Sequence, residues 1–130
     1  MVLEMRVALT TEQWDQLVAF YRDGLGLDPG DLWTEHGRGQ IFHAGRATLE
    51  IFDEGHAAAV DELEVGQRVS GPLRFAFEVP DVHAALERAL AYGAELVHEP
   101  VLTPWNDYNA RVQAPDGLQV TLFQVMEQTA

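Results

Sequence analysis

The chain has 130 residues, of which 47% are hydrophobic and 22% charged, a length and composition that suit one folded domain and argue against disorder. Its formal net charge is −13, and such an acidic surface repels nucleic acid and anionic membranes. Cysteine, long apolar runs and a signal-peptide pattern are lacking, which excludes disulfides and thiolate metal sites and leads us to expect a cytoplasmic protein that does not enter membranes.

The first half of the chain predicts a strand, a helix and three more strands. Residues 3–10 alternate apolar and polar side chains, as a half-buried strand does. Thr10 is placed to cap a helix whose apolar residues follow at helical spacing from Trp14 onward, and Gly24 and Gly26 are placed to end it. Three short strands separated by glycine-containing turns follow, at 31–36, 40–43 and 47–53.

The second half predicts the same order of elements. The stretch 55–71 is rich in alanine and acidic residues and has weak periodicity, so we interpret it as a linker with a helical turn at 57–63. A strand at 73–79 leads through Pro80 and Asp81 into a helix that stops at Gly93. The remaining strands are predicted at 95–98, 108–114 and 118–125.

Two short patterns recur about half a chain apart. Arg6-Val7-Ala8-Leu9 matches Arg74-Phe75-Ala76-Phe77 with an offset of 74 − 6 = 68, and Leu49-Glu50-Ile51-Phe52 matches Val120-Thr121-Leu122-Phe123 with an offset of 121 − 50 = 71. A half of this size buries too little surface to be stable alone. We therefore predict one domain over 1–130, made of two modules at about 1–54 and 72–126 that a linker at about 55–71 joins.

The alternation within the strands separates two faces. The face turned away from the helices is predicted to carry polar and aromatic side chains, namely Arg6, Thr48, Glu50, Phe52, Arg74, Glu78, Gln119, Thr121 and Phe123. The opposite face is wholly apolar, which suits packing against the helices. We expect the mixed face to line a ligand cleft between the modules.

The segment Phe20-Tyr21-Arg22-Asp23-Gly24-Leu25-Gly26-Leu27 resembles a signature of the vicinal oxygen chelate superfamily, which contains glyoxalase I, bleomycin resistance proteins and extradiol dioxygenases. Residues 75–81 and 114–117 are similar to its second-half signatures, so the resemblance covers nearly the whole chain. It implies an α+β fold in which two βαβββ modules form curved mixed sheets around a ligand cleft, usually in a homodimer. Pairing of the modules within one chain and exchange between two chains both remain open.

The enzymes of this superfamily hold a divalent metal with four side chains from the first and last strands of each module. The resemblance assigns Arg6, Glu50, Arg74 and Thr121 to these positions. Arginine has no lone pair to give a metal, and two guanidiniums would repel a cation and pair with Glu50, which lowers its pKa. We therefore expect no metal, no cofactor and no catalytic residue, with Glu50 either facing a ligand or held in a structural ion pair.

Aromatic residues supply the remaining site candidates. Trp33 lies among polar neighbours, and Trp105 and Tyr108 lie in a loop region with few core signals. They serve either partial packing or the stacking of an aromatic ligand. The predicted ligand-binding residues are Trp33, Glu50, Trp105, Tyr108, Arg6, Arg74, Phe52 and Thr121.

Three functions compete on this basis. The leading hypothesis is a metal-free, bleomycin resistance-like homodimer that sequesters a cationic, planar, antibiotic-like molecule without transforming it. The second is a metal-dependent lyase, isomerase or dioxygenase with a displaced ligand set, such as Glu50 with His36 or His43. The third is a metal-free enzyme, or a structural module whose cleft is filled by Arg6, Glu50 and Arg74.

Overall fold

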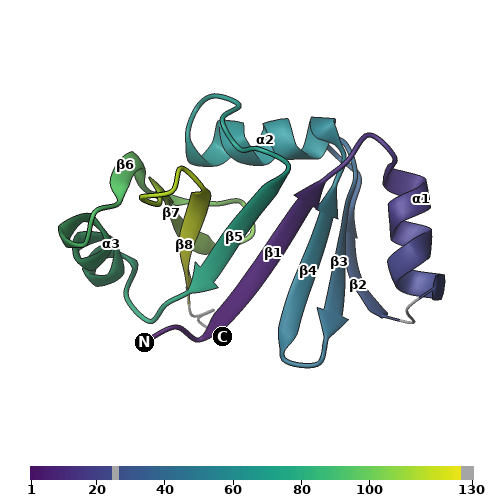
Figure 1. Cartoon of the computed structure of the whole chain (residues 1–130), viewed down its shortest axis with the longest axis horizontal. Coiled ribbons are helices and arrows are strands. Elements are labelled where there is room, and N and C mark those ends of the chain that lie inside the picture. The colour runs from purple at the N-terminus through teal and green to yellow at the C-terminus, as the bar shows by residue number, and fades with distance from the viewer. Residues whose placement is uncertain (25–26, 127–130) are drawn as a thin grey trace.

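The alternating segments of both halves form strands of one sheet. The computed structural model of the chain describes residues 1–24 and 27–126, and these contain eight strands. The strands are β1 (Glu4–Thr10), β2 (Asp28–Trp33), β3 (Gly39–Ala44), β4 (Ala47–Phe52), β5 (Leu73–Glu78), β6 (Glu95–Leu102), β7 (Asp107–Gln113) and β8 (Gln119–Val125). Their order across the sheet is β2-β3-β4-β1-β5-β8-β7-β6, so the sheet is mixed, curved and open, as Figure 1 shows.

The sheet is built from two modules with the same topology. β1 pairs in parallel with β4, and β5 pairs in parallel with β8. β1 and β5 pair with each other in antiparallel register, with Val7 opposite Phe75, and this pairing joins the two halves. The predicted α+β fold with two βαβββ modules is confirmed, and the modules pair here within one chain.

Three α-helices and one π-helical turn lie in the same described residues: α1 (Trp14–Ala19), η1 (Phe20–Gly24), α2 (Glu54–Glu64) and α3 (Val82–Ala91). The predicted cap of the first helix at Thr10 was wrong, because α1 begins only at Trp14, and in the turn before it Thr11 Oγ1 accepts a hydrogen bond from the backbone of Gln13, at 3.0 Å. Gly26, predicted to end that helix, lies outside the described residues. No helix in residues 1–24 or 27–126 is long and apolar enough to span a membrane.

The stretch between the modules holds a full helix of 11 residues instead of the single turn predicted at 57–63. Asp53 caps α2 by accepting a hydrogen bond from the backbone of His56, at 2.9 Å. α2 packs against β4 of the first module and against β6 and β7 of the second, and Figure 1 shows it lying across one end of the sheet. The stretch therefore contributes a structural element that contacts both modules.

Two strand boundaries also differ from the prediction. β2 covers 28–33, because Trp33 already pairs with Gly39 and the predicted strand residues 34–36 form the turn before β3. β6 continues through Pro100 to Leu102. A proline is tolerated there because β6 lies at the edge of the sheet, where a strand needs ladder hydrogen bonds on one side only.

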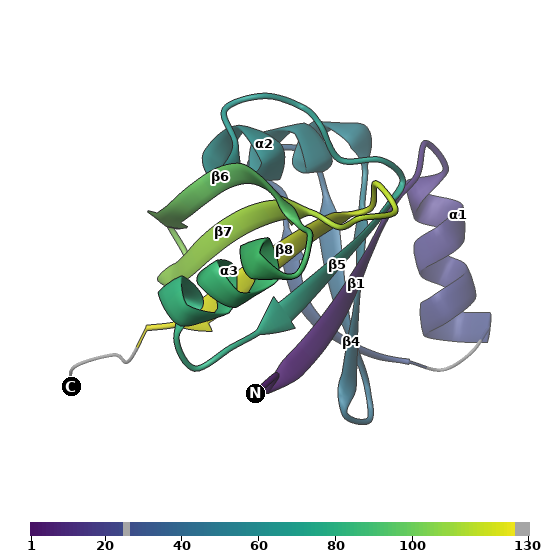
Figure 2. The ribbon, with the colours of Figure 1, turned by 60° about the vertical axis from the view of Figure 1, so that its left-hand side comes forward.

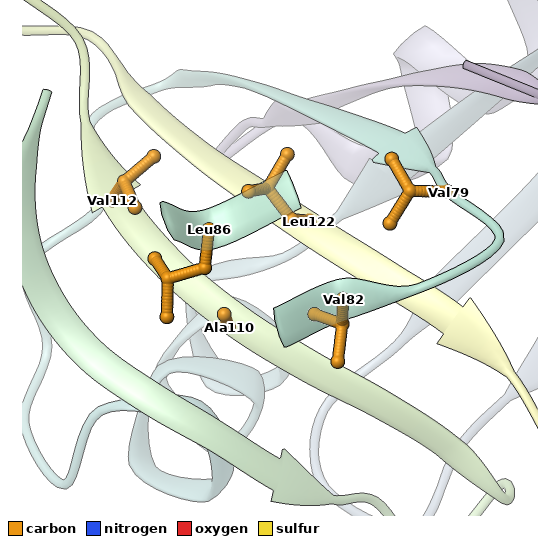
Figure 3. Close-up of a cluster of buried hydrophobic side chains, with 6 residues drawn as sticks. All are labelled: Val79, Val82, Leu86, Ala110, Val112 and Leu122. Carbon is orange, nitrogen blue, oxygen red and sulfur yellow. The ribbon is translucent and has the colours of Figure 1, made fainter. Parts of the chain in front are cut away.

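The outer face of the sheet carries two hydrophobic clusters, and a third, which contains Ala8, Phe52, Ala57 and Val60, packs against α2. The cluster beneath α1 contains Trp14, Val18, Phe42 and Ile51. The cluster beneath α3 contains Val79, Val82, Leu86, Ala110, Val112 and Leu122 (Figure 3). Figure 2 shows α3 lying over β7 and β8. Because α1 and α3 each cover the outer face of one module, the inner face of the curved sheet is left for the site.

Candidate functional site

The inner face of the sheet lines a cavity of about 530 Å³ to which both modules contribute. Seven of the eight predicted ligand-binding residues line it: Arg6, Trp33, Glu50, Phe52, Arg74, Trp105 and Thr121. Two other residues predicted on this face, Glu78 and Gln119, are not part of the lining. The structure therefore gathers most of the candidate residues around one cavity, while their role in binding stays a prediction.

Tyr108 lies elsewhere, so its expected place near the cleft was wrong. Successive side chains of a strand point to opposite faces, and in β7 Asp107 and Asn109 line the cavity. Tyr108 packs instead against the cluster beneath α3, with its ring centroid 5.4 Å from that of His83.

Arg6 forms an ion pair within its own strand and none with Glu50. Its Nε atom lies 3.2 Å from Glu4 Oε1, and its guanidinium lies 4.7 Å from the ring centroid of Phe123. Glu4 also accepts a hydrogen bond from Thr48 Oγ1 at 2.5 Å. Burial raises the pKa of Glu4, but the hydrogen bonds from Arg6 and Thr48 outweigh it and hold this pKa below its usual value. The charge of Arg6 is thus largely neutralised by Glu4 within the cavity wall.

Arg74 is buried, with 6% of its surface exposed. Its Nη1 atom donates a hydrogen bond to Thr121 Oγ1 at 2.8 Å. Within residues 1–24 and 27–126, no carboxylate oxygen lies within 4.0 Å of its guanidinium nitrogens. The expected pairing of both arginines with Glu50 was therefore wrong.

Glu50 lines the cavity, and in the described part of the chain its carboxylate has neither a hydrogen bond nor an ion pair within 4.0 Å. Burial raises the pKa of Glu50, and the more distant charges of Arg74 and Arg6 lower it by less. The lowered pKa expected from the sequence was wrong, because the guanidiniums are directed to Glu4 and Thr121. Glu50 is consequently a carboxyl group that a ligand can engage.

A buried ion network that sequence reasoning missed forms part of the cavity wall. Arg111 is 0% exposed and contacts Asp61 Oδ1 and Glu64 Oε1 of α2, each at 3.0 Å. Burial raises the pKa of Asp61, but hydrogen bonds from Ser70 and Val69 outweigh it and lower this pKa to about 2. Glu64 lines the cavity and accepts a hydrogen bond from Thr121 at 2.9 Å. The network fixes α2 to the second module.

Two tryptophans lie at the edge of the cavity. Trp33 comes from the end of β2 and Trp105 from the turn between β6 and β7, and their ring centroids are 6.5 Å apart with planes inclined by 55°. Asn106, with φ at +67°, permits the tight turn that presents Trp105, since asparagine tolerates this conformation better than most residues. The turn is closed by a hydrogen bond from the Asn106 amide to the Thr103 carbonyl, at 3.0 Å.

Further lining residues had not been selected from the sequence, among them Asp31, His56, Asp107 and Asn109. His56 is half-buried, burial lowers its pKa, and its Nδ1 atom lies 3.2 Å from the His36 carbonyl oxygen. The alternation of β7 was the available signal for Asp107 and Asn109, since Thr121 pairs with the inward-facing Arg111 of the same strand.

The side chains at the four positions that the resemblance assigns to a metal do not fit a divalent ion. Arg6 and Arg74 cannot donate to a metal, and the Thr121 hydroxyl is already bonded to Arg74 and Glu64. In residues 1–24 and 27–126, no group of three or more histidine, cysteine or acidic side chains is placed to hold an ion. Of the two histidines suggested as partners of Glu50 in a displaced set, His43 lines the same cavity as Glu50 and His36 does not.

Comparison with known proteins identifies the family. The family described as the glyoxalase/bleomycin resistance protein/dioxygenase superfamily matches residues 5–122. No curated protein matches the chain.

Solved structures share the fold at low sequence identity. Methylmalonyl-CoA epimerase from Mycobacterium tuberculosis superposes with a TM-score of 0.71 at 16% identity, over 97% of this chain and 90% of that one. Methylmalonyl-CoA epimerase from Streptomyces coelicolor, in complex with 2-nitronate-propionyl-CoA, gives 0.69 at 17%, over 98% and 100%. A superfamily member from Vibrio splendidus 12B01 gives 0.67 at 15%, over 94% and 98%. With the family match spanning nearly all of the sequence, the chain belongs to the glyoxalase/bleomycin resistance protein/dioxygenase superfamily.

Proposed function

We propose that this protein binds one small, cationic organic ligand with a planar part in its cavity and sequesters it without transforming it. The observation that carries this proposal is the cavity of about 530 Å³, with two tryptophans at its edge and the unpaired carboxyl group of Glu50 within it. A cavity of this volume suits a drug-sized molecule. The resemblance to bleomycin resistance proteins suggests an antibiotic-like ligand.

The charges of the lining support a cationic ligand. The acidic lining residues are Glu4, Asp31, Glu50, Glu64 and Asp107, and the arginines are Arg6 and Arg74. Glu4 is neutralised by Arg6, and Glu64 by Arg111. Three carboxyl groups then face one guanidinium, and this excess favours a ligand of positive charge.

Titration of a panel of cationic, planar compounds against the intrinsic tryptophan fluorescence tests the proposal. We expect at least one compound to give a saturable change in fluorescence. Glu50→Gln should lower the affinity for that compound by about tenfold. Glu87→Gln, an equal charge change at an exposed position of α3, should leave the affinity unchanged. A panel without any saturable response, or an affinity that Glu50→Gln does not alter, would contradict the proposal.

One observation favours a second candidate, a metal-independent isomerase. The raised pKa and free position of Glu50 suit a general base, and the buried guanidinium of Arg74 lines the same cavity and could stabilise an oxygen that becomes negative. Incubation of each bound compound with the protein in deuterium oxide separates the two functions. A sequestering protein leaves carbon-bound hydrogens unexchanged, whereas a base at Glu50 exchanges one of them.

We also propose that the chain forms a homodimer through the outer face of β1 and β5. α1 packs against β4 and α3 against β6, β7 and β8, whereas Met5 of β1, Leu73 of β5 and Leu3 just before β1 are exposed by 42%, 36% and 53%. An apolar stripe of this kind is typical of an interface. Light scattering should give the mass of a dimer for the wild type and of a monomer for Met5→Asp, and a monomeric wild type would reject the proposal.

A further inference from the structure

We propose that Trp33, Trp105, Asp31 and Asp107 form a cage at the edge of the cavity for an alkylated ammonium group. The inference rests on the proposed binding function. It specifies which chemical group of the ligand carries the positive charge and which part of the cavity holds it.

The two tryptophans occupy equivalent places in the internal repeat. Their offset is 105 − 33 = 72, close to the 121 − 50 = 71 that relates Thr121 to Glu50. In each module the tryptophan lies where the outermost strand leads into its antiparallel neighbour. The curvature of the sheet brings these two distant edges together, so that the ring centroids are 6.5 Å apart. The contact between the rings thus closes the open side of the sheet with one aromatic wall from each module.

The geometry of the rings favours a compact cation over a flat group between the two tryptophans, so the planar part of the proposed ligand would lie elsewhere in the cavity. A flat ring held between two others needs nearly parallel walls about 7 Å apart, twice the carbon contact distance. The indole planes are instead inclined by 55° and form a wedge. Cation–π attraction requires a charge within about 6 Å of a ring centroid, and with centroids 6.5 Å apart one cation can meet this condition for both rings. A rounded group such as trimethylammonium fits such a wedge.

Asp107 supplies the strongest argument for charge. It is 7% exposed, and the structure as described shows no cation within 4.0 Å of its carboxylate. Burial raises the pKa of Asp107, against the opposing effects of Arg6 and of a hydrogen bond from the Trp105 side chain. Arg6 is itself held by Glu4 at 3.2 Å. A buried carboxylate without a counter-ion is unfavourable, and an ammonium ligand would supply the missing charge.

Asp31 adds a second carboxylate from the other module. It lies two residues before Trp33 in β2, so both side chains belong to one face of the strand, and both line the cavity. Each tryptophan therefore has an aspartate two residues away in sequence, and all four side chains line the same cavity. Alkyl groups on the nitrogen would contact the indole faces, while the aspartates attract the charge without requiring an N–H donor.

Choline and dimethylbutanol, in which carbon replaces the charged nitrogen, form a matched pair of probes. Proton–nitrogen correlation NMR of the indole groups reports on each tryptophan separately. We expect choline to shift the signals of Trp33 and Trp105 saturably, and dimethylbutanol to bind at least about tenfold more weakly. Trp14 serves as an internal control, because its Nε1 donates to the Ile51 carbonyl in the core at 3.1 Å. Equal binding of the two probes, or a shift of Trp14 alone, would overturn the cage.

Variants then test the individual walls. Trp33→Leu, Asp107→Asn and Asp31→Asn should each weaken choline binding by about tenfold. Asp31→Asn keeps the test valid if the other variants misfold, because Asp31 is exposed and its substitution should not disturb folding. Asp28→Asn makes the same charge change in the same strand, outside the cavity lining, and should have no effect. Unchanged affinity in all three variants would reject the proposal.

The failure of the cage and the failure of the proposed function give different results. If a planar cation of the fluorescence panel binds and depends on Glu50 while choline does not bind, the cage is wrong and the binding function stands. If neither type of compound binds, the binding function fails and the cage with it.

Discussion

The two modules have the same strand and helix topology but differ in how the charges on their inner faces are paired. In the second module, Thr121 lies opposite Arg111, which is fully buried and bonded to two carboxylates of α2. In the first module, the equivalent Glu50 lies opposite Ile41, an apolar side chain. Glu50 therefore lacks a cross-strand partner that could neutralise it.

The same contrast holds for the two repeated arginines. Arg6 is paired with a carboxylate of its own strand, at 3.2 Å, whereas Arg74 donates to the hydroxyl of Thr121, at 2.8 Å. The second module uses its polar groups to hold α2 in place, and the first leaves a carboxyl group available in the cavity. An internal repeat can thus keep its fold while one copy serves stability and the other leaves a carboxyl group free for the proposed binding.

The largest effect should come from breaking the buried network. Arg111→Met leaves Glu64 buried without its cation and leaves Asp61 with Arg68 as its one remaining ion-pair partner among the described residues, so we expect a loss of about 3–5 kcal/mol in the free energy of unfolding. Urea denaturation followed by circular dichroism measures this loss. Arg22→Met removes an equal charge from an exposed pair and should change the stability little. Equal stability of both variants would show that the network is not structural.

Substitution at the two equivalent positions sharpens the comparison, because the expected effects have opposite signs. Thr121→Val removes the hydroxyl that bonds Arg74, Arg111 and Glu64, and should cost about 1–3 kcal/mol. Glu50→Leu removes a partly buried carboxyl group without a bonded partner, and should raise the stability at neutral pH by about 1 kcal/mol. The midpoints of thermal unfolding of the two variants test both signs. A destabilised Glu50→Leu would indicate that Glu50 has a structural partner.

Much of this fold follows from period-two patterns and from the repeat. Both can be read from the sequence without knowledge of tertiary contacts, so the strand order of each module and the lining of the cavity by Glu50 and Phe52 were predictable. The length of α2 was not. Its periodicity is weak, and its helix depends on the Asp53 cap and on ion pairs with Arg111, a residue distant in sequence.

The parts of the site that were wrong have two causes. Alternation shows which face a side chain occupies, but not which neighbour a long arginine reaches. Arg6 turned to Glu4 and Arg74 to Thr121, and this reverses the expected pKa of Glu50. Tyr108 was grouped with Trp105 by closeness in sequence, although the alternation of β7 places it on the outer face.

The pH dependence of stability should carry opposite contributions from Asp61 of α2 and Glu50 of the first module. The pKa of Asp61 is lowered from 3.8 to about 2, so its contribution is present above about pH 4 and is lost as the pH falls toward 2. The pKa of Glu50 is raised above 4.5, so its contribution is favourable at low pH and is lost as the pH rises through the raised value. Asp61→Asn should flatten the acid limb of the unfolding curve, and Glu50→Gln should flatten the limb above pH 4.5. If either variant showed the same dependence of stability on pH as the wild type, the contribution assigned to that residue would be contradicted.

The smallest expected effect is the response to metal, and it tests whether Arg6 and Arg74 abolish the superfamily's metal site. Protein incubated with nickel, manganese, iron or zinc and then desalted should retain less than about a tenth of an equivalent by mass spectrometry, because two of the four positions hold guanidiniums. The double variant Arg6→His, Arg74→His supplies imidazoles at both positions beside Glu50, and should retain more metal than the wild type. Close to one equivalent of a single metal in the wild type would instead establish a ligand set outside these four positions and make a metal-dependent enzyme the better interpretation.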